Sequence, residues 1–168
     1  MLKIELLAKH HDREAFRCSE QDLDEYLKKT ARQHNEKGIS RTFILVDSDE
    51  PKKILGFFTL TSCEVITTAL PERYAKKYPS RAPAAKLARL AVSIDFQRRG
   101  FGKIMMVEAM RRTLAVSENI GIIGFFVDAK NKSAREYYEQ FGFVSLPSNP
   151  LSLFLPLSTL AVALQRAG

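Results

Sequence analysis

The sequence lacks the features that direct a chain into a membrane or an oxidising compartment. No apolar run approaches the ~18 residues of a membrane-spanning helix. The N-terminal stretch MLKIELLAKHHD has no signal-peptide core. The two cysteines, Cys18 and Cys63, fall in unrelated segments and fit neither a disulfide framework nor a metal site. We therefore expect reduced thiols, no metal, no membrane association and a cytoplasmic location.

Internal repeats, low-complexity segments and a second domain are also missing from the pattern. The 168 residues suit one hydrophobic core, so a single domain over residues 1–168 is expected. Hydrophobic residues make up 45% and charged residues 27%, which excludes an intrinsically disordered chain.

The positive charge is unevenly distributed. The chain carries a net +7, but residues 72–112 hold eleven lysines and arginines against three acidic residues. This segment therefore accounts for +8, and the rest of the chain for −1. Such a surplus suits a polyanionic ligand, and a solvated basic surface kept for solubility is the alternative.

The segment 86–103, KLARLAVSIDFQRRGFGK, lies inside the basic region and has an unusual order of features. An apolar run is followed by a polar turn, and Gly100 and Gly102 then lead into a helical pattern. The first N–H groups of a helix have no internal partner and carry a partial positive charge. Glycines let a ligand approach them closely. The segment predicts a strand, a tight turn and a helix that binds a phosphorylated ligand.

Two common phosphate loops are excluded here. A Walker A loop needs Ser or Thr after Gly-Lys, but Ile104 follows Lys103. A dinucleotide fingerprint needs Gly or Ala where Met105 stands.

The rest of the chain predicts an alternation of strands and helices. A capping box at Ser19 to Asp22 opens an amphipathic helix over residues 20–36 that Gly38 ends. The helix after Gly102 has an apolar stripe that includes Ile104 and Val107. A short strand is expected near the N-terminus, and further strands at 42–46, 54–65, 87–92, 121–128, 143–145 and 151–155. We expect a long connection at 66–83 that contains a short helix near 71–78. Two more helices are expected at 132–140 and 157–167.

The loop Gln97 to Gly102 resembles the Gln/Arg-x-x-Gly-x-Gly/Ala pyrophosphate loop of the GNAT N-acetyltransferases. The resemblance implies an α/β (α+β) chain with the GNAT acyl-CoA N-acyltransferase fold. In this fold a mixed central sheet, flanked by helices, splits between two parallel strands and binds acetyl-CoA. The coenzyme would contact Leu90, Ala91, Val92, Gln97, Arg98, Arg99, Gly100, Phe101, Gly102, Lys103, Asn131 and Ala134.

A second stretch, from Ala134 to Phe143, is similar to the family's A-x-x-x-Y-x-x-x-G-F segment. The resemblance implies that Tyr138 donates a proton to the leaving coenzyme A thiolate, while Tyr137 faces elsewhere on the helix. A phenol of pKa near 10 stays protonated at neutral pH, as this role requires.

A general base for the attacking amine is hard to find in the sequence. The three histidines lie far upstream of the motif, and no acidic residue occurs between Lys86 and Ser93. Glu64 and Asp128 remain candidates that would act through water. An α-amine of pKa about 7.7 is partly neutral at physiological pH, whereas a lysine amine of pKa about 10.4 is not. The missing base therefore favours an α-amino substrate.

Nearly the whole chain is similar to the acetyltransferase toxins of bacterial toxin–antitoxin pairs. The similarity lies in segments 16–27, 56–60, 88–92 and 153–156, although Ser19 stands where Gly is common. It implies acetylation of the α-amine of aminoacyl-tRNA, blocked translation and a ribbon-helix-helix antitoxin, and leaves a homodimer open. A housekeeping acetyltransferase acting on a small amine or a protein N-terminus, and a coenzyme-binding regulator without activity, are the alternatives. The candidate tRNA contacts are Arg73, Lys76, Lys77, Arg81, Lys86 and Arg89.

Overall fold

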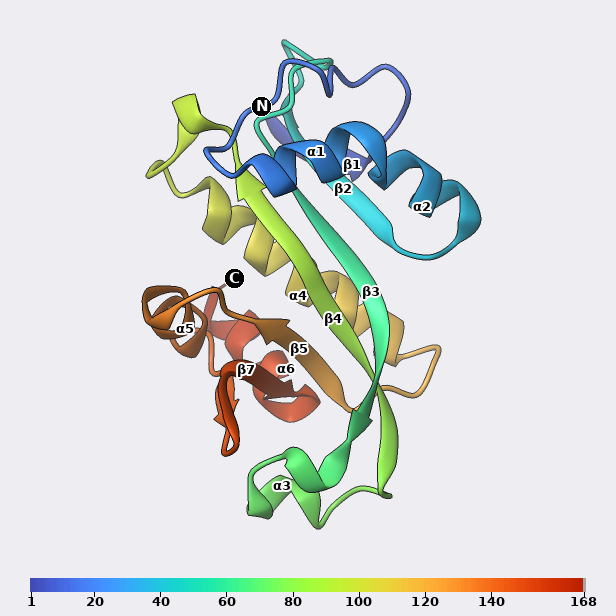
Figure 1. Cartoon of the computed structure of the whole chain (residues 1–168), viewed down its shortest axis with the longest axis vertical. Coiled ribbons are helices and arrows are strands. Elements are labelled where there is room, and N and C mark those ends of the chain that lie inside the picture. The colour runs from blue at the N-terminus through green and yellow to red at the C-terminus, as the bar shows by residue number, and fades with distance from the viewer. Residues whose placement is uncertain (168) are drawn as a thin grey trace. The chain divides into compact units, whose positions relative to one another are not determined.

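The computed structural model describes residues 1–167 (Figure 1). Its strands and helices follow one another in the predicted order, except that the first predicted helix is divided into two. The helices and strands are β1 (Leu2–Leu6), α1 (Gln21–Lys29), α2 (Ala31–Lys37), β2 (Arg41–Asp47), β3 (Gly56–Ile66), α3 (Glu72–Ala75), β4 (Arg81–Val92), α4 (Phe101–Ser117), β5 (Gly124–Asp128), α5 (Lys132–Glu139), β6 (Val144–Leu146), β7 (Asn149–Pro156) and α6 (Leu157–Ala167).

The strands form one mixed sheet of seven in the order β1-β2-β3-β4-β5-β7-β6. The β4–β5 pair is parallel, and β1–β2, β2–β3, β5–β7 and β6–β7 are antiparallel. The parallel register runs from Ala85 opposite Phe125 to Leu87 opposite Val127, while β4 itself continues to Val92. The predicted mixed sheet with a parallel central pair is confirmed.

The chain divides into two compact units. The first unit holds residues 1–61 and 88–108, and the second holds residues 62–87 and the chain from 109 onward. β3 and β4 each contribute residues to both units.

In the first unit, α1 and α2 cover one face of the strands, as Figure 1 shows for β2 and β3. Phe57 of β3 is fully buried in a core that also holds Tyr26 and Leu27 of α1. Burying a side chain of this size stabilises the fold by about 1.5–3 kcal/mol. Gly56, the neighbour of Phe57, points to the opposite face, where an added Cβ would lie 2.7 Å from the Met105 methyl group of α4. An added Cβ would also lie 2.9 Å from the Ala91 carbonyl oxygen, which cannot move aside as a methionine methyl group can, so glycine suits this position.

The first helical segment differs from the prediction of one helix over residues 20–36. It breaks at Thr30, whose φ of −120° and ψ of −39° end α1 before α2 begins at Ala31. The expected capping box is also wrong. Ser19 has a left-handed φ of 76°, and Glu20 takes the N-cap position with no side-chain cap bond. Gly38 closes α2 in the left-handed conformation, as predicted.

In the second unit, the expected strand over 121–128 begins only at Gly124. Gly124, Phe125, Phe126 and Val127 are all buried, which explains their continuous apolar pattern. β4 starts at Arg81, inside the stretch that the sequence assigned to a connection. Pro83 has no backbone N–H to donate, but its carbonyl still accepts a hydrogen bond of 2.9 Å from the Ile123 amide. Proline is therefore tolerated in this strand.

The apolar stripe predicted on α4 is partly wrong. Ile104 is 40% exposed, whereas Met105, Met106 and Met110 are buried. Among residues 1–167, no helix combines the length and apolarity that crossing a bilayer would require.

Candidate active site

The segment after β4 forms the predicted turn and is fastened to its surroundings by backbone bonds. The Ser93 amide donates to the Leu55 carbonyl and the Ile94 amide donates to the Arg17 carbonyl, both at 2.8 Å. A 3₁₀ turn over Ile94–Phe96 follows. These bonds fix the direction in which the chain leaves β4.

Gln97 acts as a clamp at the start of the glycine-containing loop. Its side-chain amide nitrogen donates to the carbonyls of Val92 and Cys18, both at 3.1 Å. The side chain thus holds the loop to the end of β4 and to the segment before α1. The sequence identified Gln97 as part of the motif, but gave no sign that Cys18 would be its partner.

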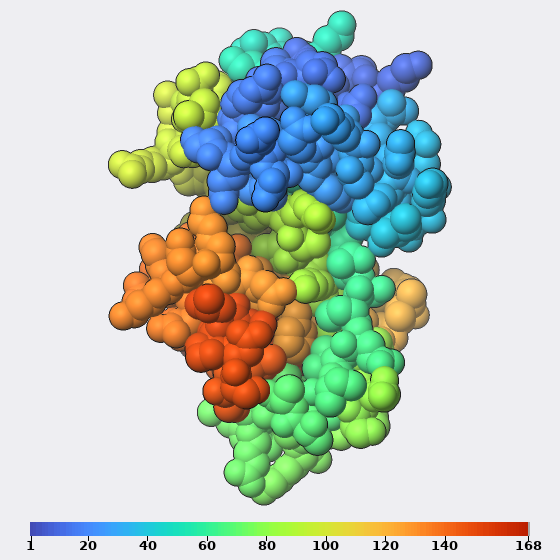
Figure 2. Space-filling view, in the orientation of Figure 1, coloured from blue at the N-terminus to red at the C-terminus, as the bar shows by residue number. Residues whose placement is uncertain are grey.

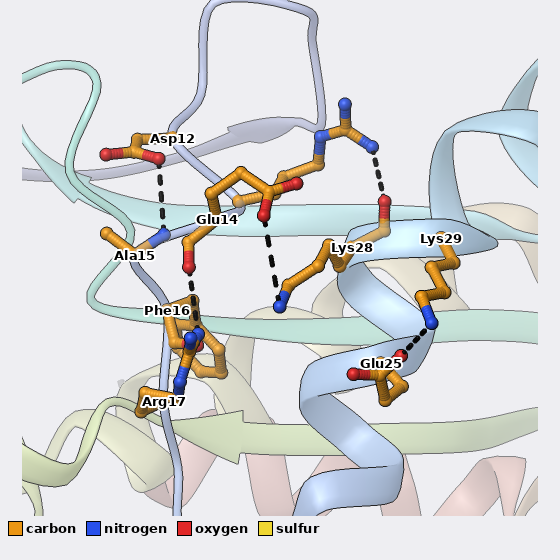
Figure 3. Close-up of polar contacts among 9 residues, drawn as sticks. Asp12, Glu14, Ala15, Phe16, Arg17, Glu25, Lys28 and Lys29 are labelled. Atoms are coloured by element: carbon orange, nitrogen blue, oxygen red, sulfur yellow. Dashed lines mark hydrogen bonds and ion pairs between the residues drawn. The ribbon is translucent and has the colours of Figure 1, made fainter.

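The segment before α1, which supplies the Cys18 carbonyl, makes further polar contacts (Figure 3). The Asp12 carboxylate accepts from the Ala15 amide at 3.2 Å, and the Arg17 guanidinium donates to the carbonyl of Glu14 at 2.8 Å. The Glu14 carboxylate lies 3.9 Å from the Lys28 ammonium group of α1. These contacts connect the segment that holds Gln97 to α1.

The loop backbone is shaped to receive an anion. Arg98 and Gly100 both have left-handed φ values, 64° and 84°. Alternation of handedness turns successive N–H groups toward one point and forms an anion-binding nest. α4 begins at Phe101, so the amides of its first turn have no helical acceptor. Arg98 adopts a conformation that costs a non-glycine residue about 1–2 kcal/mol, the kind of strain found at functional sites.

Cationic and aromatic side chains surround this loop. Arg98, Arg99 and Lys103 are exposed. The Arg99 guanidinium lies 5.2 Å from the centre of the Phe96 ring, which stacks on Phe101 at 6.0 Å. Lys53, from the segment before β3, also lies over Phe96, at 5.0 Å. Sequence reasoning missed Lys53 because it is remote in the chain and belongs to no motif.

The last residues of β4 present their backbone beside this loop. The parallel register with β5 includes Leu87, and Leu90, Ala91 and Val92 follow it. Ala91 is buried, and its neighbours are half-buried. These three residues and residues 97–103 all belong to the first unit, so the structure brings together most of the predicted coenzyme contacts.

Tyr138 lies on α5 in the second unit, together with Asn131 and Ala134. The predicted cap is confirmed, because the Asn131 side chain accepts from the Ala134 amide at 2.9 Å. The Tyr138 ring makes edge contacts with Phe143 at 5.9 Å and Tyr137 at 5.6 Å. Burial, with a smaller effect of Tyr137, raises the pKa of Tyr138 to about 12. The phenol therefore stays protonated throughout the physiological range.

The two candidate bases are both engaged in ion pairs. The Glu64 carboxylate lies 2.8 Å from the Arg81 guanidinium, beside a pocket of about 420 Å³. Asp128 lies 2.8 Å from the Lys86 ammonium group and accepts from the Ser152 hydroxyl at 2.7 Å. Burial raises the pKa of Asp128, but these two hydrogen bonds outweigh it and leave the pKa below its usual value. Neither carboxylate is poised as a strong base.

The six predicted tRNA contacts fall into two groups. Lys76, Arg81 and Lys86 are neutralised by carboxylates at 3.1, 2.8 and 2.8 Å. The other three lie over tyrosine rings. Arg73 of α3 and Lys77, just after this helix, lie over the Tyr74 ring, and Arg89 lies over the Tyr26 ring. The chain around α3 is the green segment at the bottom of Figure 2.

Known proteins resemble this chain over most of its length. A tRNA-acetylating toxin of Mycobacterium tuberculosis is 33% identical over 141 residues, covering 84% of this chain and 83% of that protein. The toxin AtaT complexed with acetyl-methionyl-tRNAfMet superimposes with a TM-score of 0.89 at 30% identity, covering 96% and 98% of the two chains. A Tyr-to-Phe mutant of AtaT bound to acetyl-CoA and the C-terminus of the antitoxin AtaR gives 0.80 at 28% identity, covering 98% and 99%. The acetyltransferase (GNAT) family model matches residues 5–143, and the chain belongs to this family.

Proposed function

We propose that this acetyltransferase is a toxin that transfers the acetyl group of acetyl-CoA to the α-amine of an aminoacyl-tRNA and thereby blocks translation. The main support is the 33% identity, over 84% of the chain, to a protein named as a tRNA-acetylating toxin. The structural similarity to AtaT in complex with an acetylated charged tRNA points in the same direction. Because the family match spans residues of both units, we treat residues 1–168 as one catalytic domain.

The residues after β4 fit the phosphates of acetyl-CoA. The nest at Arg98 and Gly100, the free amides at the start of α4 and the exposed cations Arg99 and Lys103 supply donors and positive charge for a pyrophosphate. Phe101 and Gly102 would contribute backbone amides, whereas Gln97 would act by holding the loop. The backbone of Leu90, Ala91 and Val92 would pair with the amide-rich pantetheine arm, and Asn131 and Ala134 would border it. Acetyl-CoA supplies the activated acetyl thioester.

Tyr138 is the residue we assign to the leaving thiolate. With a pKa of about 12, its phenol remains a hydrogen-bond donor at any pH the cell reaches. A backbone N–H near Val92 would polarise the thioester carbonyl, as in an oxyanion hole. The amine must lose one proton as the new C–N bond forms and the C–S bond breaks. The thiolate, of pKa about 8.5, gains one, so the reaction balances without another reagent.

The ion pairs of Glu64 and Asp128 support a substrate that needs no strong base. At pH 7.4 roughly a third of an α-amine of pKa about 7.7 is already neutral. Among the candidate tRNA contacts, Arg73, Lys77 and Arg89 are better suited to phosphates than Lys76, Arg81 and Lys86, whose charges are compensated within the protein.

The proposal extends to partners. A structure of an AtaT mutant bound to the C-terminus of the antitoxin AtaR is known, and we propose that an antitoxin, of the ribbon-helix-helix class, binds this chain as well. A homodimer would enlarge the tRNA-binding surface. Charged tRNA as a substrate places the reaction in the cytoplasm.

Incubation of the protein with labelled acetyl-CoA and total charged tRNA tests the proposal, with free amino acids, polyamines and peptides in parallel. Label in the aminoacyl group, released by mild alkali that cleaves the ester, is the expected result. Label only in small amines or in peptide N-termini would refute the toxin and favour a housekeeping acetyltransferase. Coenzyme binding with no transfer to any acceptor would favour a regulator.

A further inference from the structure

Arg89 of β4 is a half-buried cation that is held by an aromatic ring and by no carboxylate of residues 1–167. Its guanidinium carbon lies 3.6 Å from the centre of the Tyr26 ring, and residues 1–167 offer it no ion-pair partner within 4.0 Å. Partial burial of a charge is unfavourable, and a cation–π contact returns only about 0.5–2 kcal/mol. A charge kept in this state indicates that an anion completes the site.

Tyr26 is a firm support for this guanidinium. The ring is 7% exposed in the core of the first unit, and its hydroxyl lies 3.3 Å from the Ser40 hydroxyl. His34 of α2 packs its ring edge-on against it at 5.9 Å. With its carbon 3.6 Å from the ring centre, the guanidinium is held by the Tyr26 ring, and N–H groups that do not face the ring remain available for two oxygens of a phosphate.

Arg89 lies on the face of β4 opposite to α4. Side chains alternate along a strand, so Arg89 and Ala91 share one face. Ala91 belongs to the same core as Tyr26 and Phe57, which places this face toward α1. Gly56, next to Phe57 in β3, instead meets Met105 of α4. The coenzyme loop leads into α4, so an anion bound by Arg89 would approach from the other side of the strand.

The spacing along β4 indicates which anion this is. At about 3.3 Å per residue, Arg89 is roughly 10 Å from Val92, where the acetyl carbonyl would lie. In an aminoacyl-tRNA, about eight bonds separate the reacting α-amine from the phosphorus atom on the 5′ side of the terminal adenosine, and they also span roughly 10 Å when extended. Resting on the proposed function, we propose that Arg89 binds this terminal phosphodiester and so selects aminoacyl-tRNA over free aminoacyl compounds.

Comparing two acetyl acceptors isolates the contribution of the phosphate. One is an aminoacyl-tRNA, and the other is the corresponding 3′-O-aminoacyl adenosine, which carries no phosphate. For Arg89→Met we expect kcat/KM on aminoacyl-tRNA to fall about 10- to 150-fold, the range for a hydrogen bond to a charged group. The rate on aminoacyl adenosine and the KM for acetyl-CoA should not change. The slope of log K for tRNA binding against log salt should become shallower by about 1.

Arg89→Lys should recover part of the lost rate, because it keeps the charge without the fork. Arg32→Met, which removes a half-buried α2 charge paired with Glu36, is the matched control and should leave the rates on both acceptors unaffected. Equal loss on both acceptors, or no loss on either, would overturn the role of Arg89 while leaving the proposed function intact. A wild-type protein that acetylates neither acceptor would refute the proposed function itself. Should Arg89→Met fail to fold, the ratio of the two rates in Arg89→Lys decides the question.

Discussion

Replacing Tyr138 by Phe removes one hydroxyl and keeps the ring. The edge contacts of the ring with Phe143 and Tyr137 involve no hydroxyl and should survive. Among residues 1–167 that hydroxyl has no hydrogen-bond partner, so the fold should lose nothing. We expect a melting temperature within about 2 °C of wild type, since 1 kcal/mol shifts Tm by only about 2–4 °C in a chain of this size.

The effect on the rate follows from the raised pKa of Tyr138. Complete proton transfer from a phenol of pKa about 12 to a thiolate of pKa about 8.5 would be uphill by roughly 5 kcal/mol. In the proposed mechanism the hydroxyl would therefore serve as a hydrogen-bond donor to the leaving thiolate, and the proton itself would come from the amine. A hydrogen bond to a charged group contributes about 1.5–3 kcal/mol. Tyr138→Phe should accordingly lower kcat by about 10- to 150-fold and leave the KM for acetyl-CoA within about twofold.

The pH profile gives an independent readout of the same group. The proposed role requires the protonated form of Tyr138, and its raised pKa keeps the phenol protonated. The rate at subsaturating aminoacyl-tRNA should rise around pH 7.7 as the α-amine becomes neutral, and then stay level to pH 10. An unperturbed phenol would instead cause a fall near pH 10. Steady-state release of coenzyme A, followed with a thiol reagent after quenching, measures both quantities.

Two results would contradict this reasoning. A variant with wild-type kcat would show that the hydroxyl makes no contact that strengthens in the transition state. A raised KM for acetyl-CoA at unchanged kcat would assign Tyr138 to coenzyme binding alone.

Three further changes test the fold around the site by thermal or urea unfolding. Ser19→Gly should raise the free energy of unfolding by about 0.5–1 kcal/mol, because glycine accepts the left-handed φ of 76° without strain; a loss of stability would contradict this. Gly124→Ala should destabilise by at least 3 kcal/mol or prevent folding, since its Cβ would lie 2.3 Å from the Leu155 carbonyl oxygen; a near-neutral effect would show that β5 and β7 can move apart. The pKa of Glu5 is lowered, and the main cause is the hydrogen bond from His11. The stabilisation from this bond is therefore complete at pH values above the pKa of Glu5 in the unfolded chain, and it is lost as the pH falls through the lower pKa of the folded protein. Glu5→Gln should therefore reduce the difference between the free energies of unfolding at pH 6 and at pH 3. An unchanged difference would show that the titration of Glu5 does not contribute to the pH dependence of stability.

Local signals were sufficient to predict the loop and the helix that follows it. Gly100 and Gly102 mark a turn and a helix start, and both requirements are satisfied within a few residues. The same holds for Asn131, which caps α5 through the amide of Ala134. Such contacts are encoded by neighbours in the sequence, so a pattern can predict them.

Features that depend on remote partners were predicted poorly. β4 starts at Arg81, where the strand pairs with remote residues: the Pro83 carbonyl accepts from the Ile123 amide, some forty residues away. In the same way, the exposure of Ile104 depends on which elements cover each side of α4. The basic region shows the same limit, because its count of charges gave no sign that Asp128 would neutralise Lys86. Departures from a family pattern were more informative than they first seemed. Ser19 has a left-handed φ of 76°, a conformation that glycine adopts more readily than serine.

The alternation of side chains along the last turns of β4 has an evolutionary consequence. Arg89 and Ala91 face α1, whereas the loop after Val92 leads into α4. Selection can therefore remodel α1 and α2 to accept a different amino acid or a different nucleic acid, while the machinery for the acetyl donor is inherited unchanged. A break in the helix at Thr30 would make that remodelling easier, because α2 can shift without dragging α1 along. Related enzymes that differ in the acceptor they modify should differ first in these two helices.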